Sequence, residues 1–333
     1  MDSNYTLYPD CIIVEGVVKC AVYDLTRNKI IFIPDTLYEI LSQYNGFPLN
    51  ILRKMYKGEE DTLNEYLEFL LKHEFLYKSC DIPNFKSIST NCNDSALISN
   101  IIIDVKEYSS HKYDILIDEI RTVRCKSILL RFYFLIDIEE LIKILSHFQP
   151  PEILDIKILL PFYNKKISKE IKDKIIALDI LITDIIFFGS PYNKQIEKNG
   201  VQIEYITDEI KDETHCGNIR LRNFSVNIKM FMESKNYNNC LYKKLSIDSK
   251  GNIKNCPSCR ESYGLLGEDS FLEVVKKPEF KKYWNIKKDD IEICKVCEFR
   301  YACIDCRVYR SDNENIFSKP LKCNYNPYEE ENK

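Results

Sequence analysis

The spacing of cysteine in the last third of the chain constrains this sequence more than any other feature. The segment CKVCEFRYACIDC holds two CxxC pairs, and CPSC at position 256 provides a third. A CxxC turn presents two thiolates to one metal centre with little strain. We therefore predict that the cysteines between positions 216 and 323 are metal ligands. They are Cys216, Cys240, Cys256, Cys259, Cys294, Cys297, Cys303, Cys306 and Cys323.

Composition describes a globular chain that is not built to bind nucleic acid. The 333 residues suggest two or three domains, and 45% apolar residues are enough for buried cores. A net charge of -4 offers no basic footprint for a phosphate backbone, so we expect no nucleic-acid partner. The nine glycines spell neither GxGxxG nor a P-loop.

The pattern of apolar residues predicts neither a secretory signal nor a membrane span. The start, MDSNYTLYPD, has no basic region followed by an apolar one, and the most apolar stretch, IIALDILITDIIFFG, is interrupted by Asp179 and Asp184. We expect a cytoplasmic protein with no membrane partner. Clustered cysteines in that reducing compartment are metal ligands more often than disulfides.

Residues 1–78 are predicted to form a small α+β unit. The runs CIIVEGVVKCAVYDL and KIIFIP suggest a hairpin turning at 26–29. Asp35 is placed to N-cap a first helix, and two further helical stretches follow. This order is similar to winged-helix-like peptide-recognition domains, in which a leader peptide adds as a strand to a sheet edge. The alternative is a structural cap. Residues 79–95 are predicted to be a linker, with Cys80 and Cys92 as incidental thiols.

The middle section, residues 96–215, alternates apolar strands with amphipathic helices. This alternation predicts an α/β unit with a parallel sheet, either open or part of a βα barrel. Chemistry in such folds lies at the carboxyl ends of the strands. The polar residues expected there are Asp104, Arg131, Tyr133 and Ser190, none of which the sequence singles out as catalytic.

The cysteine region, residues 216–333, is predicted to begin with a hairpin that brings Cys240 and Cys256 together, followed by a polar helix near 270–284. Zinc sites with two CxxC pairs have roughly fifteen to twenty residues between the pairs. Only five residues separate Cys297 from Cys303, a spacing that favours iron–sulfur ligation. Zinc is the alternative metal.

The full pattern, C240-x10-G251-x4-C256, then C294-x2-C297-x5-C303-x2-C306, then C323, resembles the SPASM domain that follows the radical S-adenosylmethionine barrel in peptide maturases. The family spacing before its sixth cysteine is x3, and here it is x2. The resemblance implies up to two auxiliary 4Fe–4S clusters. It assigns Cys240, Cys256 and Cys306 to the first, and Cys294, Cys297, Cys303 and Cys323 to the second. Either Cys259 or Cys216 completes the first cluster.

The CxxxCxxC motif that binds the radical cluster is absent from the whole sequence. The resemblance therefore implies a degenerate partial βα (TIM-like) barrel that does not use S-adenosylmethionine. With YDLTRNKIIFIP, HCGNI and CEFRYACIDCR, the chain resembles the SPASM maturases of grasp-with-spasm systems. That likeness implies a ribosomal precursor peptide and an ATP-grasp ligase as partners. Whether the chain is itself an enzyme is left open. The alternatives are an iron–sulfur enzyme without radical chemistry and a zinc-stabilised scaffold.

Overall fold

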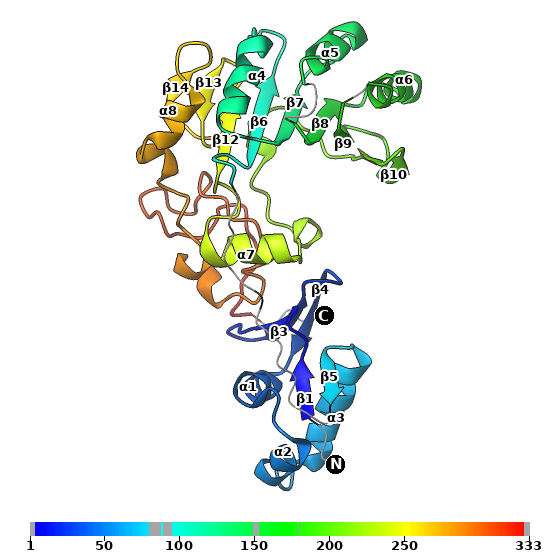
Figure 1. The fold of residues 1–333 in the computed structure, drawn as a ribbon, viewed down its shortest axis with the longest axis vertical. Helices are drawn as coiled ribbons and strands as arrows, with labels where there is room; N and C mark the ends of the chain where they lie inside the picture. The colour runs from blue at the N-terminus through cyan, green and yellow to red at the C-terminus, as the bar shows by residue number, and fades with distance from the viewer. Residues whose placement is uncertain (1–3, 80–87, 89–94, 149–152, 179, 330–333) are drawn as a thin grey trace.

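The computed structural model describes residues 4–79, 88, 95–148, 153–178 and 180–329. Along its longest axis, a layer of sheet and helices stands at one end, cysteine-rich loops lie in the middle, and the N-terminal unit forms the other end (Figure 1). Cys80 and Cys92 lie outside the described residues, as does most of the predicted linker.

A sheet of nine strands carries the middle section, in the order β10-β11-β9-β8-β7-β6-β12-β13-β14. Six adjacent strands run parallel: β6 (Asn100–Val105), β7 (Ser127–Phe132), β8 (Asp155–Pro161), β9 (Ile182–Phe188), β11 (Val201–Tyr205) and β12 (Lys244–Ile247). Antiparallel strands extend both sides: β10 (Lys194–Lys198), β13 (Asn252–Lys254) and β14 (Gly264–Leu265). The predicted α/β class is confirmed, whereas the partial barrel stays a prediction.

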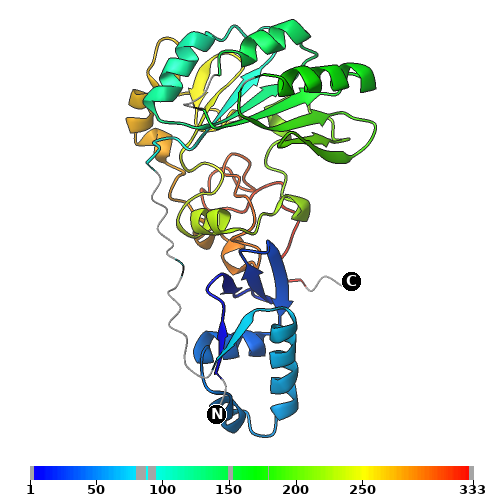
Figure 2. The ribbon, with the colours of Figure 1, turned by 45° about the vertical axis from the view of Figure 1, so that its right-hand side comes forward.

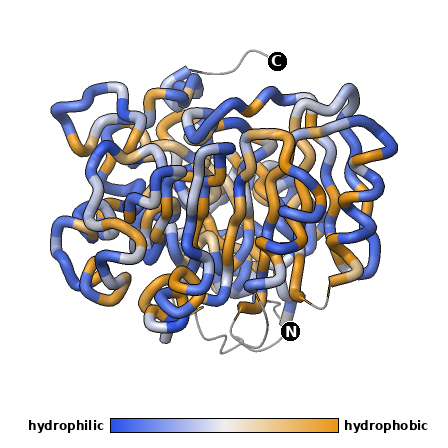
Figure 3. The backbone as a smooth tube through the Cα atoms, turned by 90° about the horizontal axis from the view of Figure 1, so that it is seen from above, coloured by the Kyte–Doolittle hydropathy of each residue, from blue (hydrophilic) through white to orange (hydrophobic). Residues whose placement is uncertain are grey.

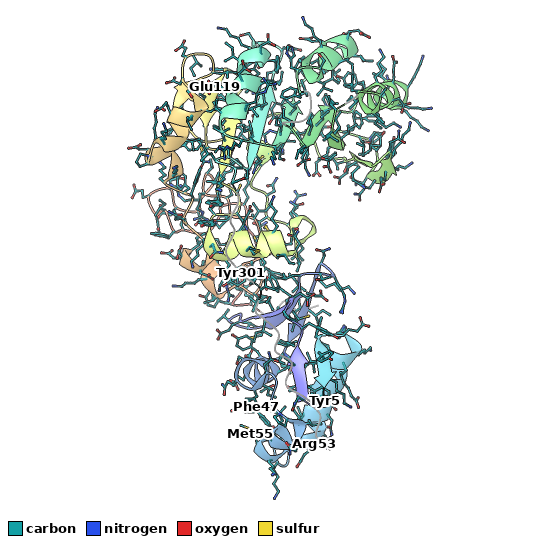
Figure 4. The ribbon with its side chains drawn as sticks, in the orientation of Figure 1. Tyr5, Phe47, Arg53, Met55, Glu119 and Tyr301 are labelled. Atoms are coloured by element: carbon teal, nitrogen blue, oxygen red, sulfur yellow. The ribbon has the colours of Figure 1, made fainter. Side chains whose placement is uncertain are left out.

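Helices cover one face of this sheet (Figure 2). They are α4 (Tyr113–Thr122), α5 (Ile138–Leu145), α6 (Lys165–Ile176) and, at the β14 end, α8 (Phe271–Lys276). Alternate residues of each strand, such as Ile101 and Ile103 of β6, are fully buried in the core beneath them. Glu119 of α4 accepts a hydrogen bond from the Phe271 backbone N–H at 2.6 Å, which ties α8 to α4 (Figure 4). From above, the hydrophobic stretches gather toward the middle of the molecule (Figure 3).

The cysteine region shares the sheet with the middle section. Its predicted hairpin is present as β12 and β13, and the Asp248 carboxylate holds the turn by accepting from the Lys250 and Asn252 backbone N–H groups at 2.9 and 3.0 Å. Strand β12 pairs with β6, so residues on both sides of position 216 build one sheet. The helix predicted over 270–284 is shorter, because Pro278 ends it, and a 3₁₀ turn follows at η3 (Glu279–Lys281).

Outside the N-terminal unit, the remaining described helical elements are single turns, apart from α7. They are η1 (Glu213–His215), η2 (Leu221–Asn223), α7 (Ile228–Asn236), η4 (Lys288–Asp290) and η5 (Cys294–Val296). No helix within the described part of the chain combines the length and the apolar character of a membrane span.

The N-terminal unit has the predicted order of a hairpin followed by three helices. Its helices are α1 (Asp35–Tyr44), α2 (Leu49–Met55) and α3 (Glu60–Lys72), and its strands are β1 (Asn4–Leu7), β2 (Cys11–Val14), β3 (Cys20–Asp24), β4 (Lys29–Ile33) and β5 (Leu76–Ser79). The run from 11 to 25 is two strands rather than one. Asp35 is the first helical residue and not the cap, and its carboxylate accepts from the Cys20 thiol at 3.3 Å. The winged-helix likeness stays a prediction.

The N-terminal unit docks on the five residues between Cys297 and Cys303, which we call the spacer. The Tyr23 hydroxyl, fully buried, donates to the Glu298 carbonyl oxygen at 2.6 Å. The Val17 backbone N–H donates to the Val296 carbonyl oxygen at 3.0 Å, just before the spacer. These bonds join strands at one end of the sequence to the cysteine motif at the other.

Close packing completes the joint. A side-chain carbon at Gly16 would lie 2.9 Å from Cβ of Glu298 and would also strike the Lys19 carbonyl, so the turn between β2 and β3 needs glycine there. Phe32 of β4 meets Phe299 edge to face, with ring centroids 5.5 Å apart. One hydrophobic cluster contains buried residues of both parts: Val14, Ala21, Tyr23, Leu25, Val226, Phe231, Tyr301 and Ala302. Tyr301 is marked in Figure 4.

We predict that Tyr23→Phe weakens this joint. The change leaves the Glu298 carbonyl without its buried donor, which costs about 1–3 kcal/mol of the free energy of unfolding. Tyr108→Phe is the control, because that hydroxyl bonds Ser249 at an exposed position and its loss should cost within about 0.5 kcal/mol. Denaturant unfolding of the full chain measures both. Equal effects of the two changes would contradict the docking described here.

Candidate metal centres

Five of the cysteines form a first thiol group beside the sheet. Lys244, at the start of β12, interacts electrostatically with Cys240, Cys256 and Cys216, and its ammonium is 3.7 Å from Cys240 Sγ. Cys306 interacts with Cys240 and Cys256 in turn. Cys259 and Cys256 share a thiol–thiol hydrogen bond, which raises the pKa of Cys256 and lowers that of Cys259. The first thiol group is thus Cys216, Cys240, Cys256, Cys259 and Cys306.

Gly217 explains how Cys216 reaches this group. Its φ is +82°, in the left-handed region that favours glycine, and a side-chain carbon there would lie 3.0 Å from Cys306 Sγ. The chain therefore bends past Cys306 with no room for a larger residue.

The other four cysteines form a second thiol group between the sheet layer and the N-terminal unit. Cys294 and Cys303 interact electrostatically with each other and with Cys323. Cys297 interacts with Cys294 and Cys303. The second thiol group is thus Cys294, Cys297, Cys303 and Cys323.

Buried charges surround the second thiol group. The Lys288 ammonium, 3% exposed, lies 3.6 Å from Cys303 Sγ, 3.9 Å from Cys294 Sγ and 3.7 Å from Asp305 Oδ1. Arg307 Nη2 lies 2.7 Å from the same Asp305 oxygen. Two cations share one carboxylate, which leaves one positive charge facing the thiols. Burial alone would lower the pKa of Lys288, but Cys303, Asp305 and Cys294 outweigh it and raise that pKa.

An ion pair on the sheet also contacts the first thiol group. Asp104 lies near the carboxyl end of β6, and Arg131 is the residue paired with it on β7. Arg131 Nε and Nη2 donate to the two Asp104 oxygens at 2.6 and 2.9 Å, and Nη1 donates to Cys216 Sγ at 3.0 Å. From the sequence, Asp104 and Arg131 are predicted only to be polar residues at strand ends, because no local pattern indicates the contact with Cys216.

The two remaining strand-end candidates differ in their surroundings. The Tyr133 hydroxyl donates to Asp104 Oδ1 at 3.3 Å and belongs to the same cluster. Ser190 is buried, but its backbone N–H donates to the Ile206 carbonyl and its hydroxyl accepts from the Tyr192 N–H, away from the thiols.

Most of the thiols are held protonated by burial. Burial raises the pKa of Cys303 to about 11 and that of Cys306 and Cys297 to about 12. Cys216 and Cys259 are the exceptions. Burial would raise the pKa of Cys216, but the hydrogen bond with His215 and the charge of Arg131 lower it to about 7. The hydrogen bond with Cys256 lowers the pKa of Cys259, which is buried whereas Cys216 is half-buried. Metal binding must therefore displace protons from most of these thiols.

The donor chemistry fits thiolate-bound metal, although the described side chains do not converge on a single ion. Within the described residues, no three or more His, Cys, Asp or Glu side chains are grouped as ligands of one metal ion. A cubane binds each thiolate at a different iron, so its ligands stand farther apart than those of one zinc ion. The soft sulfur donors and the buried cations beside them suit an anionic thiolate cluster.

Comparisons with known proteins give distant matches. No protein-family model matches the chain, and no curated protein matches it. Three crystal structures of SuiB from Streptococcus suis align with 91% of this chain and 96% of theirs. The one bound to S-adenosylmethionine is 12% identical with a TM-score of 0.32, and the one bound to the precursor peptide SuiA is 11% identical with a TM-score of 0.31. The third, SuiB alone, gives 12% and 0.32. TM-scores this low do not establish a shared fold.

We predict that Cys216 is the first of these thiols to react with iodoacetamide when the chain is metal-free. Its pKa is depressed, so its contribution to stability is present above the ordinary thiol pKa and is lost as pH falls through about 7. Alkylation of Cys216 should therefore reach half of its maximal rate near that pH. Cys303 and Cys306 should be unreacted at about pH 8. Peptide mapping by mass spectrometry follows each cysteine, and a Cys216 that reacts only with the others would contradict the geometry.

Proposed function

We propose that this chain is a cytoplasmic maturation protein for a ribosomally synthesised peptide, which binds the precursor and carries two auxiliary 4Fe–4S clusters. The observation that supports it best is the separation of the nine cysteines into two groups. Their membership agrees with the ligand sets that the SPASM resemblance implies, with Cys216 and Cys259 both in the first group. Clusters held by these groups would supply one-electron chemistry or a fixed charge.

Charge balance supports clusters at both groups. A 4Fe–4S centre with four thiolates is a buried anion, and burying an anion is costly unless cations face it. Lys288 faces the second group at 3.6 Å, and Lys244 faces the first at 3.7 Å. No step of catalysis follows from this arrangement, and we favour presentation of the precursor to a partner enzyme over independent catalysis.

The N-terminal unit offers an edge for the peptide. In the three-stranded sheet β2-β3-β4, strand β4 pairs with β3 on one side and with no other described strand. Lys29 and Phe32 of β4 are exposed. Unpaired N–H and C=O groups along such an edge can accept an added strand, which is how leader peptides bind recognition domains. The implied partner that uses the presented peptide is an ATP-grasp ligase.

Two other functions compete with this one. An iron–sulfur enzyme acting on the peptide without radical chemistry would use an iron left open by the thiolates, yet the first group has five thiols for four positions. In a scaffold stabilised by zinc, the same cysteines would bind zinc ions instead of clusters. Zinc needs all four ligands around one ion.

Co-purification from the native cells tests the proposal. A tagged chain, purified without oxygen, should carry with it a ribosomal precursor peptide and an ATP-grasp ligase, both identified by mass spectrometry. Recovery of neither would overturn the proposed function.

We predict that Ile31→Pro in β4 weakens binding of the co-purified peptide at least tenfold. Proline removes a backbone N–H and adds bulk to the strand, which blocks strand addition. Ile196→Pro places the same change in β10, the edge of the large sheet, and should leave peptide affinity unchanged. Fluorescence anisotropy with the labelled peptide measures both affinities. Equal affinities for the two variants would exclude the β4 edge.

A further inference from the structure

We infer that Arg131, fixed by Asp104, is a positioning residue that commits Cys216 to the first metal centre. The inference rests on the proposed cluster at the first thiol group and adds to it two residues outside the cysteine motif. They come from β7 and β6, so the sheet itself would take part in holding the metal.

All three guanidinium nitrogens of Arg131 donate hydrogen bonds. Two of its nitrogens form a side-on pair with both Asp104 oxygens, at 2.6 and 2.9 Å, which fixes the plane of the guanidinium. The third nitrogen then has one direction available, and Cys216 Sγ stands in it at 3.0 Å. Lysine could not make this arrangement, since a single ammonium cannot pair side-on with a carboxylate and reach a third group in a fixed direction.

The desolvation of this buried ion pair costs folding free energy, which suggests that the pair has a role besides stability. Arg131 is 2% exposed and Asp104 is 1% exposed. Apolar residues of similar volume in place of a buried ion pair are often neutral or stabilising for a fold. The same face carries a second ion pair, in which Lys157 of β8 lies 2.9 Å from Asp184 of β9. Both of its side chains are partly exposed to solvent. The buried pair is the one that touches a thiol.

The contact has two consequences for a metal bound by Cys216. A donor aimed at the sulfur holds the side chain in one orientation, and loss of such partners weakens metal binding by about 10–100-fold. A hydrogen bond and a positive charge at a cluster sulfur also favour the reduced, more negative state, so they raise the reduction potential. The second thiol group makes no contact with Arg131 and should be indifferent to it.

Arg131→Met tests the inference, with Lys157→Met as the matched control. Each chain is reconstituted without oxygen with ferrous iron and sulfide and then exposed to a graded series of chelator. We expect wild type and Lys157→Met to lose iron together. Arg131→Met should release about half of its iron at about 10–100-fold lower chelator concentration, because one of two centres is weakened. Arg131→Lys should behave like Arg131→Met.

The half that is retained shows that the Arg131→Met chain is folded. Redox titration then measures the reduction potential of the first cluster. We expect this potential to fall in Arg131→Met and not in Lys157→Met. If Arg131→Met lost iron from both centres alike, the role of Arg131 would be overturned. The same would follow if its iron release and its reduction potential both equalled those of the wild type. A wild-type chain that binds no iron under these conditions would overturn the proposed function and this inference together, whereas the other two results leave the proposed function standing.

Discussion

The cysteine-rich loops lack the regular hydrogen bonding that normally holds a chain together, and the rest of the structure depends on how they are held. In the described residues from 277 to 329, the regular elements are three 3₁₀ turns of three residues each. Segments without a ladder of backbone bonds need another source of order, and thiolate–metal bonds are a common one in small domains. Buried side chains such as Arg307, which donates to the Ser318 carbonyl at 2.8 Å, supply part of it.

Two larger parts of the molecule are attached to these loops. The sheet reaches the first thiol group through Arg131 and through β12, which carries Lys244 at its first residue. The N-terminal unit reaches the second group through the spacer, which is bounded by Cys297 and Cys303. Centres at these positions would therefore fix the distance between the β4 edge, where we propose that the peptide binds, and the large sheet. Metal centres there would have a structural role in a chain without CxxxCxxC, since holding the N-terminal unit in place needs no radical.

Local patterns predicted the elements well. Helical periodicity identified α4, α5 and α6, and the apolar runs identified the parallel strands, because both signals lie within one element. The CxxC spacings singled out six of the nine cysteines for the same reason. What the sequence could not supply were contacts between distant segments. Strand β12 joins β6 across more than a hundred residues, and Arg131 meets Cys216 across 85. The break between β2 and β3 was missed because Gly16 is needed only against Glu298, at the far end of the chain.

The central claim is that the two thiol groups hold iron–sulfur clusters. The most direct measurement is the iron, acid-labile sulfide and zinc content of chain purified without oxygen, together with its visible spectrum. The account predicts iron and sulfide in equal amounts, about four of each per filled site, and broad thiolate-to-iron absorption. A colourless chain that contains zinc and no sulfide would contradict it.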